Sequence, residues 1–189
     1  MTIFILLLEI ILTLIFLSVF TLVLVWMWSA LRTKEPFMPV PMSIMGEIHK
    51  ALNLNDDSVL YDLGCGDGRV LLYESKFHPS AHFVGFEISS FPLMLARIQT
   101  WWYSKKIKSK IEIRRQDFFI ANLSEATHLF TYLYPHVMDD LLPKLDKELK
   151  PGTRLVSISY KFTTRQPNVT IDLKRNPYKL ARTLYIYEF

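Results

Sequence analysis

Residues 3–28, IFILLLEIILTLIFLSVFTLVLVWMW, form an apolar stretch in which Glu9 is the single charged residue. As an α-helix rising about 1.5 Å per residue, this stretch is about 39 Å long, and the hydrocarbon core of a bilayer is about 30 Å thick. The helix can therefore cross a membrane with some tilt. We predict one transmembrane helix within an N-terminal anchor, residues 1–31, and expect the Glu9 carboxyl to reach the interface or to be protonated.

A cleaved signal peptide is the alternative interpretation of this stretch. Such a peptide has a basic n-region, a shorter apolar run and a small-residue cleavage site. No Lys or Arg precedes this run and no A-x-A-like site follows it, which favours a retained anchor. Trp26 and Trp28 match an aromatic belt, and Arg32 and Lys34 add positive charge beyond it. The positive-inside rule then predicts a single-pass membrane protein with residues 32–189 in the cytoplasm.

The rest of the chain is long enough for one core and is basic. The net charge is +4, and basic residues gather in YSKKIKSKIEIRR, residues 103–115. On an anchored protein such a cluster faces solvent, anionic lipid headgroups or nucleic acid. Cys65 is the only cysteine, which excludes an internal disulfide, and the five histidines lack ligand spacing. We therefore expect no metal site.

Strand-like and helix-like segments alternate after the anchor. Residues 29–41, SALRTKEPFMPVP, contain three prolines without apolar periodicity, which predicts a linker over residues 32–41. MSIMGEIHKAL then has apolar residues at helical spacing. The alternation beyond it predicts an α/β domain over residues 42–189, with a doubly wound, Rossmann-like parallel sheet. The tail, residues 161–189, predicts a closing antiparallel pair around the polar turn LKRNP. The expected strands are 58–62, 82–87, 110–114, 128–133 and 153–160, and the expected helices are 68–76, 91–104 and 137–149.

The segment YDLGCGDGRVL follows the first expected strand, which ends at Asp62. In a doubly wound sheet, ligands bind at the carboxyl ends of the strands near the topological switch point. Gly64, Gly66 and Gly68 allow the backbone to turn tightly and to approach a ligand there. A dinucleotide fingerprint needs Gly or Ala where Arg69 stands, and a Walker loop needs a G-K-[ST] that is absent. The acidic loop instead favours a ligand with a positive centre and no phosphate.

Two further expected strands also end in acidic residues. HFVGFEIS ends the second strand with Glu87, about 20 residues beyond the loop, where an acid hydrogen-bonds ribose hydroxyls in this architecture. RRQDFF ends the third, where Asp117 can accept from an adenine amino group and Phe118 can pack on the ring. Each acid alone has a structural explanation as a cap or an ion-pair partner. Three acids at the ends of three successive strands favour a nucleoside site.

At these residues the chain resembles class I S-adenosylmethionine-dependent methyltransferases. DLGCGDG matches their first motif, FEIS the acidic end of the second strand, and QDFF the adenine-contacting motif. The resemblance extends over nearly all of residues 36–160 and implies S-adenosylmethionine as the cofactor. The cofactor-binding residues that it implies are Pro39, Asp62, Leu63, Gly64, Cys65, Gly66, Gly68, Glu87, Ile88, Asp117 and Phe118.

A narrower resemblance links the chain to membrane-anchored protein-lysine methyltransferases, whose mitochondrial members modify the ATP synthase c subunit and the adenine nucleotide translocase, and to their prokaryotic relatives. PFMPVPMSIMGEIHKAL, NLSEATHLFTYLYPHVMDDLLPKLDKELKPGTRLVS and the single apolar helix carry it. The resemblance implies that residues 32–41 include a cofactor-covering segment. It also implies that YLYP, with Tyr132, Tyr134 and Pro135, forms the catalytic site that the methyl acceptor enters. The chain departs from the mitochondrial members in lacking their fourth-strand Phe-Gly pairing and a Trp after the fifth strand.

The leading hypothesis from the sequence is methyl transfer to a lysine of a membrane-associated protein, with the lipid bilayer as the other partner. Two alternatives remain open: methylation of a lipid or quinone, and a non-catalytic anchored module that binds a nucleotide or a partner protein. YLYP lacks the [DN]-P-P-[YFW] arrangement of enzymes that methylate the amino groups of adenine or glutamine, which disfavours a nucleic-acid substrate.

Overall fold

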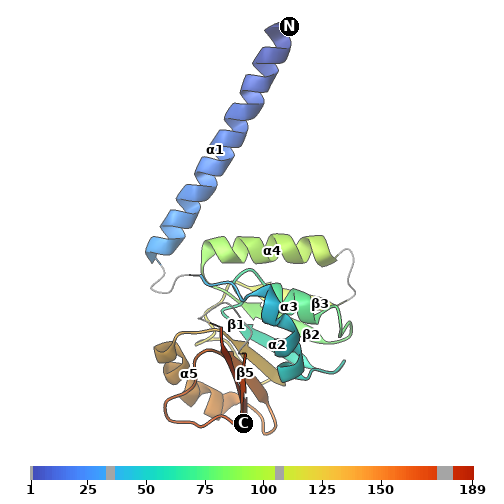
Figure 1. The fold of residues 1–189 in the computed structure, drawn as a ribbon, viewed down its shortest axis with the longest axis vertical. Helices are drawn as coiled ribbons and strands as arrows, with labels where there is room; N and C mark the ends of the chain where they lie inside the picture. The colour runs from blue at the N-terminus through green and yellow to red at the C-terminus, as the bar shows by residue number, and fades with distance from the viewer. Residues whose placement is uncertain (1, 33–36, 105–108, 174–180) are drawn as a thin grey trace.

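The computed structural model describes residues 2–32, 37–104, 109–173 and 181–189, with five helices and seven strands (Figure 1). The helices are α1 (Thr2–Arg32), α2 (Met45–Leu52), α3 (Arg69–Glu74), α4 (Ser90–Ser104) and α5 (Pro135–Glu148), with a 3-10 turn η1 (Met42–Ile44) before α2. The strands are β1 (Val59–Leu63), β2 (His82–Phe86), β3 (Lys110–Arg114), β4 (His128–Thr131), β5 (Arg154–Ile158), β6 (Val169–Asp172) and β7 (Thr183–Glu188).

The strands form one sheet in the order β3-β2-β1-β4-β5-β7-β6. Strands β1 to β5 pair in parallel, and β7 runs antiparallel to both β5 and β6. The predicted doubly wound sheet and its closing antiparallel pair are therefore confirmed. The strand order reverses between β1 and β4, so the segments after these two strands lie side by side at the carboxyl edge of the sheet. This is the switch point at which such folds bind ligands.

Each face of the sheet has its own hydrophobic core. Successive strand residues point to opposite faces, so Leu60 and Phe83 pack with the apolar residues of α2 and α3. Tyr61 and Val84, one position further along their strands, pack with the apolar face of α5. This two-sided burial explains why the central strands contain nearly continuous apolar residues. The same alternation determines toward which face of the sheet the last side chains of each strand point.

Two expected strands end two residues earlier in the structure than the sequence suggested. Strand β4 ends at Thr131, because Tyr134 is the N-cap of α5 and Pro135 is its first residue. Proline is favoured there because its missing N–H has no helical partner. Strand β5 ends at Ile158, because Ser159 has φ 65°, a left-handed conformation that breaks the extended backbone. Both strands end at the carboxyl edge of the sheet, so the loops that follow them are longer there than the sequence suggested.

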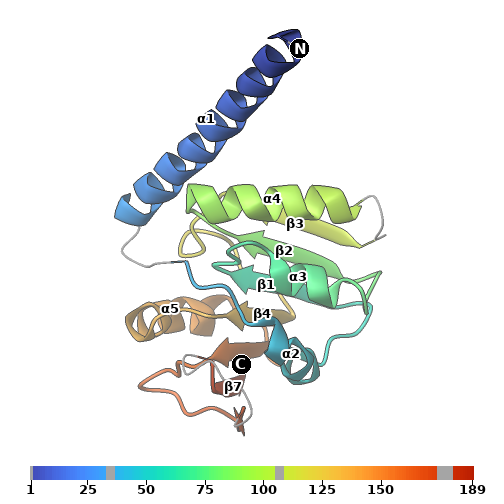
Figure 2. The ribbon, with the colours of Figure 1, turned by 45° about the horizontal axis from the view of Figure 1, so that its top comes forward.

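Helix α1 stands apart from the α/β domain except near α4 (Figures 1 and 2). Residues Ile3–Trp28 have a mean hydropathy of 2.9, and none of this segment is buried in the protein. By length and composition, α1 is the one candidate membrane span among the described residues. The helix continues to Arg32, and η1 begins at Met42. Pro36 and the neighbouring residues 33–35 of the expected linker lie outside the described residues.

Candidate active site

The glycine loop is built from left-handed turns that only glycine adopts without strain. Gly64, Gly66 and Gly68 have φ values of 77°, 56° and 76°, in the region where a Cβ atom is disfavoured. The backbone N–H groups of Gly64 and Cys65 both donate to the Phe86 carbonyl at 2.9 Å, which fastens the loop to the end of β2. The loop therefore presents backbone, rather than side chains, at the switch point.

Glu87 closes the loop from the neighbouring strand. Its Oε2 accepts a hydrogen bond from the Gly66 N–H at 3.0 Å, and its Oε1 accepts from the Ser89 N–H at 2.7 Å. A carboxylate has about four acceptor positions, so two remain for a ligand such as a pair of ribose hydroxyls. Burial raises the pKa of Glu87, while the hydrogen bonds from Ser89 and Gly66 oppose that rise. The structure thus brings together two residues that the sequence assigned to one site.

A set of buried acids lies behind the loop. Asp62 is 2% exposed, and burial, followed by repulsion from Glu87 and Asp67, raises the pKa of its carboxyl well above the usual range. Asp67 is also buried but forms a fork with Arg69, whose Nη2 lies 2.6 Å from Asp67 Oδ2. Burial and the same acids raise the pKa of the Cys65 thiol as well. Burial and mutual repulsion destabilise the carboxylate form of these acids, and a cationic ligand would relieve that penalty.

The segment that begins at Phe37, after the residues 33–36 that the structure does not describe, covers a hollow beside the loop. Phe37, Pro39 and Val40 line the hollow from one side, and the Arg69 guanidinium donates to the Val40 carbonyl at 2.9 Å. A Cβ atom built on Gly66 would lie 2.4 Å from the Phe37 ring, so the cover rests directly on the loop. The remaining lining comes from the glycine loop and the switch-point strands: Asp62, Gly64, Cys65, Gly66, Phe130 and Tyr132 are among these residues.

The other expected cofactor residues are not among the residues that line the hollow. Ile88 is 56% exposed and stands two residues before α4. Asp117 Oδ1 accepts from the Phe119 N–H at 2.9 Å, and Phe118 packs partly against the core beneath. The Leu63 side chain is fully buried in the core on the α5 side, so only its backbone can serve the site. The adenine-side assignment of Asp117 and Phe118 stays a prediction.

The acceptor side contains three tyrosines, one of which the sequence did not indicate. Tyr132 lines the hollow, and burial raises its pKa, with smaller contributions from Tyr160 and Tyr134. The rings of Tyr134 and Tyr160 stack with centroids 6.0 Å apart, and Pro135 is exposed at the start of α5. The strand expected over residues 128–133 ends at Thr131, so Tyr132 and Tyr134 lie in the segment that leads into α5.

Tyr160 reaches this group by a turn at the end of β5. Ser159 adopts φ 65°, and the Ser157 hydroxyl donates to the Tyr160 carbonyl at 2.7 Å, which folds the chain back toward the switch point. The sequence signal for this turn was weak, because a serine gives no warning of a left-handed conformation. An aromatic residue at the end of the expected fifth strand was the only available hint.

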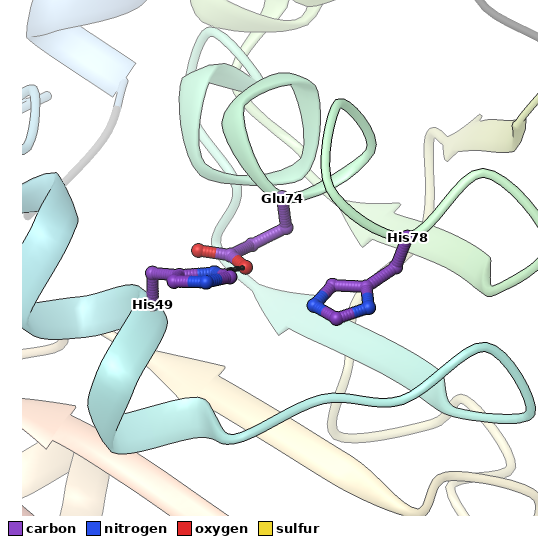
Figure 3. A group of neighbouring side chains, drawn as sticks. All are labelled: His49, Glu74 and His78. Atoms are coloured by element: carbon purple, nitrogen blue, oxygen red, sulfur yellow. Dashed lines mark hydrogen bonds and ion pairs between the residues drawn. The ribbon is translucent and has the colours of Figure 1, made fainter.

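A second polar cluster lies near the amino ends of the strands, away from the glycine loop (Figure 3). His49 Nδ1 is 2.8 Å from Glu74 Oε2, and His78 approaches both residues, with its ring centroid 5.6 Å from that of His49. The three side chains come from α2, the end of α3 and the segment before β2, so sequence spacing did not reveal them. Glu74 is fully buried, and burial raises its pKa while His49 lowers it. We interpret the pair as a tie that holds α2 against α3.

The sheet order, the glycine loop at the switch point and the buried acids define a class I methyltransferase that uses S-adenosylmethionine. The profile of the ANTKMT methyltransferase domain matches residues 62–169. The chain belongs to this family of protein-lysine methyltransferases, as the narrower sequence resemblance predicted.

Individual relatives agree with this family. A protein-lysine N-methyltransferase from Saccharolobus islandicus is 32% identical over 154 residues, which cover 80% of this chain and 92% of that protein. The adenine nucleotide translocase lysine N-methyltransferase of Mus musculus is 30% identical over 110 residues, covering 57% of this chain and 46% of that longer protein. A solved structure described as an RNA methyltransferase from Salinibacter ruber, in complex with S-adenosyl-L-homocysteine, is 32% identical with a TM-score of 0.71. That match covers 80% of this chain and 93% of the other.

Proposed function

We propose that this protein methylates a lysine side chain of a membrane-borne protein while α1 holds it at the bilayer. One observation carries the proposal: the segment that covers the acidic, glycine-walled hollow leads directly back to an exposed apolar helix. The site is therefore part of the same structural unit as the candidate membrane anchor. The protein-lysine methyltransferases among its relatives support lysine as the acceptor.

The residues of the hollow fit the cofactor. S-adenosylmethionine supplies an electrophilic methyl group on a positively charged sulfur. The carboxyls of the buried Asp62 and the partly buried Glu87 are destabilised as anions without a counter-charge, so a bound cation would stabilise their charged form, and the free acceptor positions of Glu87 suit the ribose hydroxyls. Asp117 and Phe118, at the end of β3, would hold the adenine. At Gly64 and Gly66 an added Cβ atom would lie 3.1 Å from Leu133 and 2.4 Å from Phe37, so the loop has no room for a side chain where it meets its cover.

The tyrosines would receive the lysine. An ammonium group can be attracted to an aromatic ring face, and the Tyr132 hydroxyl at the hollow can accept a hydrogen bond from it. The half-buried surroundings of Tyr132 and its neighbours Tyr134 and Tyr160 disfavour the charged amine and so promote loss of its proton. The site must hold the neutral lysine nitrogen in line with the methyl–sulfur bond of the cofactor and exclude water, and these two effects account for most of the catalysis that it must provide.

The chain length limits how far the site can lie from the membrane. Only residues 33–36 separate the end of α1 at Arg32 from Phe37. Five Cα–Cα steps span at most about 18 Å, so the cover of the hollow stays close to the end of α1. Tethering of this kind raises the effective concentration of acceptors in the same membrane without any new contact. We place the catalytic domain on the cytoplasmic side because Arg32 and Lys34 follow the apolar stretch.

RNA is a second candidate acceptor, because the structure from Salinibacter ruber is described as an RNA methyltransferase and covers most of this chain. A lipid or quinone remains the third. The acceptor classes differ in where a transferred methyl group is recovered, so one experiment separates them.

The test uses the full chain, native membranes from which the chain has been depleted, and S-adenosylmethionine labelled in its methyl group. We expect label in the protein fraction that survives lipid extraction and nuclease treatment and that yields methylated lysine on hydrolysis. Label in the organic phase, or label released by nuclease, would contradict the lysine proposal. A Glu87→Ala chain serves as the control for enzyme-dependent transfer.

A further inference from the structure

Helix α4 is apolar on the face that the protein core does not cover. Leu93 and Ala96 are buried against the domain, at 4% and 0% exposure. On the outer side, Ile98, Trp101 and Trp102 are 48%, 57% and 65% exposed. These three positions follow helical spacing, i, i+3 and i+4, so they form one stripe along the helix. A helix that is apolar on both sides needs a second apolar or interfacial environment.

The charges of α4 suit an anionic surface. The helix SFPLMLARIQTWWYS contains no acidic residue and one basic residue, Arg97, which is exposed. Lys76 lies beside its C-terminal end, with Nζ 5.5 Å from the centre of the Tyr103 ring. Arg115 approaches its N-terminal end, with Nη2 3.5 Å from Ser90 Oγ. Indole rings flanked by basic side chains are typical of helices that lie in a lipid headgroup region.

The position of α4 identifies the surface that covers this stripe. Helix α4 contacts α1, and both views show it beginning beside the domain-side end of α1 and running across the adjoining side of the domain (Figures 1 and 2). If α1 spans the bilayer, its domain-side end lies at the interface, and α4 lies there with it. The exposed α4 stripe therefore lies on the helix of the domain that contacts the anchor.

We propose that α4 lies in the bilayer interface with Ile98, Trp101 and Trp102 inserted among the lipids, as a second membrane contact beside α1. The inference rests on the proposed anchoring by α1. A single span leaves a domain free to swing and rotate, whereas a span and an interfacial helix together fix its orientation. The carboxyl edge of the sheet, with the hollow and its tyrosines, is then held at a constant height above the membrane.

The test places a fluorophore on the full chain in lipid nanodiscs that contain anionic lipid and no other protein. Ile98→Cys provides the labelling position on α4, and Thr164→Cys, exposed beyond β5, provides the matched control. Cys65 is buried in both chains. We expect a lipid-borne quencher to reduce the fluorescence at position 98 several-fold more than at 164, and iodide in solution to show the reverse order. Equal quenching at the two positions would overturn the proposal.

A second variant separates lipid from the alternatives. Trp101→Ser combined with Trp102→Ser should abolish the lipid quenching at position 98 and slow methylation of membrane-embedded acceptors several-fold. The affinity for S-adenosyl-L-homocysteine should stay unchanged. If position 98 becomes buried only after an acceptor protein is added, the stripe binds a protein partner. If it becomes buried only at two chains per disc, the stripe binds a second copy of the chain. Either result would overturn the lipid proposal. Flotation of the same nanodisc samples reports anchoring by α1 separately, so failure of the anchor and failure of the α4 contact are distinguishable.

Discussion

Replacing Glu87 with Gln tests whether the loop carboxylate holds the cofactor ribose. Both oxygens of Glu87 already accept backbone hydrogen bonds, from Gly66 at 3.0 Å and from Ser89 at 2.7 Å. An amide keeps one acceptor oxygen and places an N–H₂ group where the other stood, so one backbone N–H loses its partner. A hydrogen bond to a charged group contributes about 1.5–3 kcal/mol, which corresponds to roughly a tenfold to hundredfold change in affinity. We expect Glu87→Gln to weaken S-adenosyl-L-homocysteine binding by that factor.

Isothermal titration of the full chain in detergent measures this affinity directly. Glu112→Gln is the matched control, because Glu112 is an exposed carboxylate paired with Arg114 on β3 and its replacement changes the charge equally. The control should bind the ligand like the parent chain. If Glu87→Gln also binds like the parent but unfolds at a lower temperature, Glu87 only fastens the loop and the ribose assignment is wrong.

Three further substitutions address the loop, the acceptor side and the core. Gly66→Val places a branched side chain at φ 56° against Phe37, so titration should show no cofactor binding while circular dichroism shows a retained fold; binding at parental affinity would contradict the close approach. Tyr132→Phe removes the hydroxyl at the hollow, so turnover on a lysine substrate should fall by up to about tenfold, the equivalent of one neutral hydrogen bond of about 1.5 kcal/mol, with cofactor affinity unchanged; an unchanged turnover would exclude the hydroxyl. Burial, aided by Arg154, lowers the pKa of His128 from 6.5 to about 4, so folding stability that is present above pH 6.5 is lost as the pH falls toward 4. Between pH 7.5 and 5 the parent should lose about 2 kcal/mol more than His128→Gln in urea unfolding; equal losses would contradict the lowered pKa.

The sequence predicted the parts of the site that depend on local chemistry. Gly64, Gly66 and Gly68 stand together in one loop, and Glu87 directly follows the short apolar segment of β2. To recognise these residues as one site, it is enough to predict the local strands and turns and the parallel order of the sheet. The alternation of elements was enough to place their carboxyl ends together at the switch point.

The parts that the sequence did not predict depend on long-range placement or on backbone detail. Tyr160 joins the acceptor side because Ser159 turns left-handed, a conformation that serine rarely announces. His49, Glu74 and His78 meet only after α2 packs on α3. The length and apolar character of α4 were visible in the sequence, but its outer face could be recognised only once Leu93 and Ala96 had been placed against the domain.

The contact between the cover and the loop has a consequence for the rate of turnover. Phe37 rests on Gly66, and Arg69 ties the same segment at Val40. Release of the spent cofactor requires this segment to lift, and a few residues earlier the chain enters the anchor helix. The cover that would move is therefore tethered to the anchor helix within five Cα–Cα steps. We expect cofactor exchange to become slower in thicker or stiffer membranes, so that lipid composition controls the speed of the enzyme.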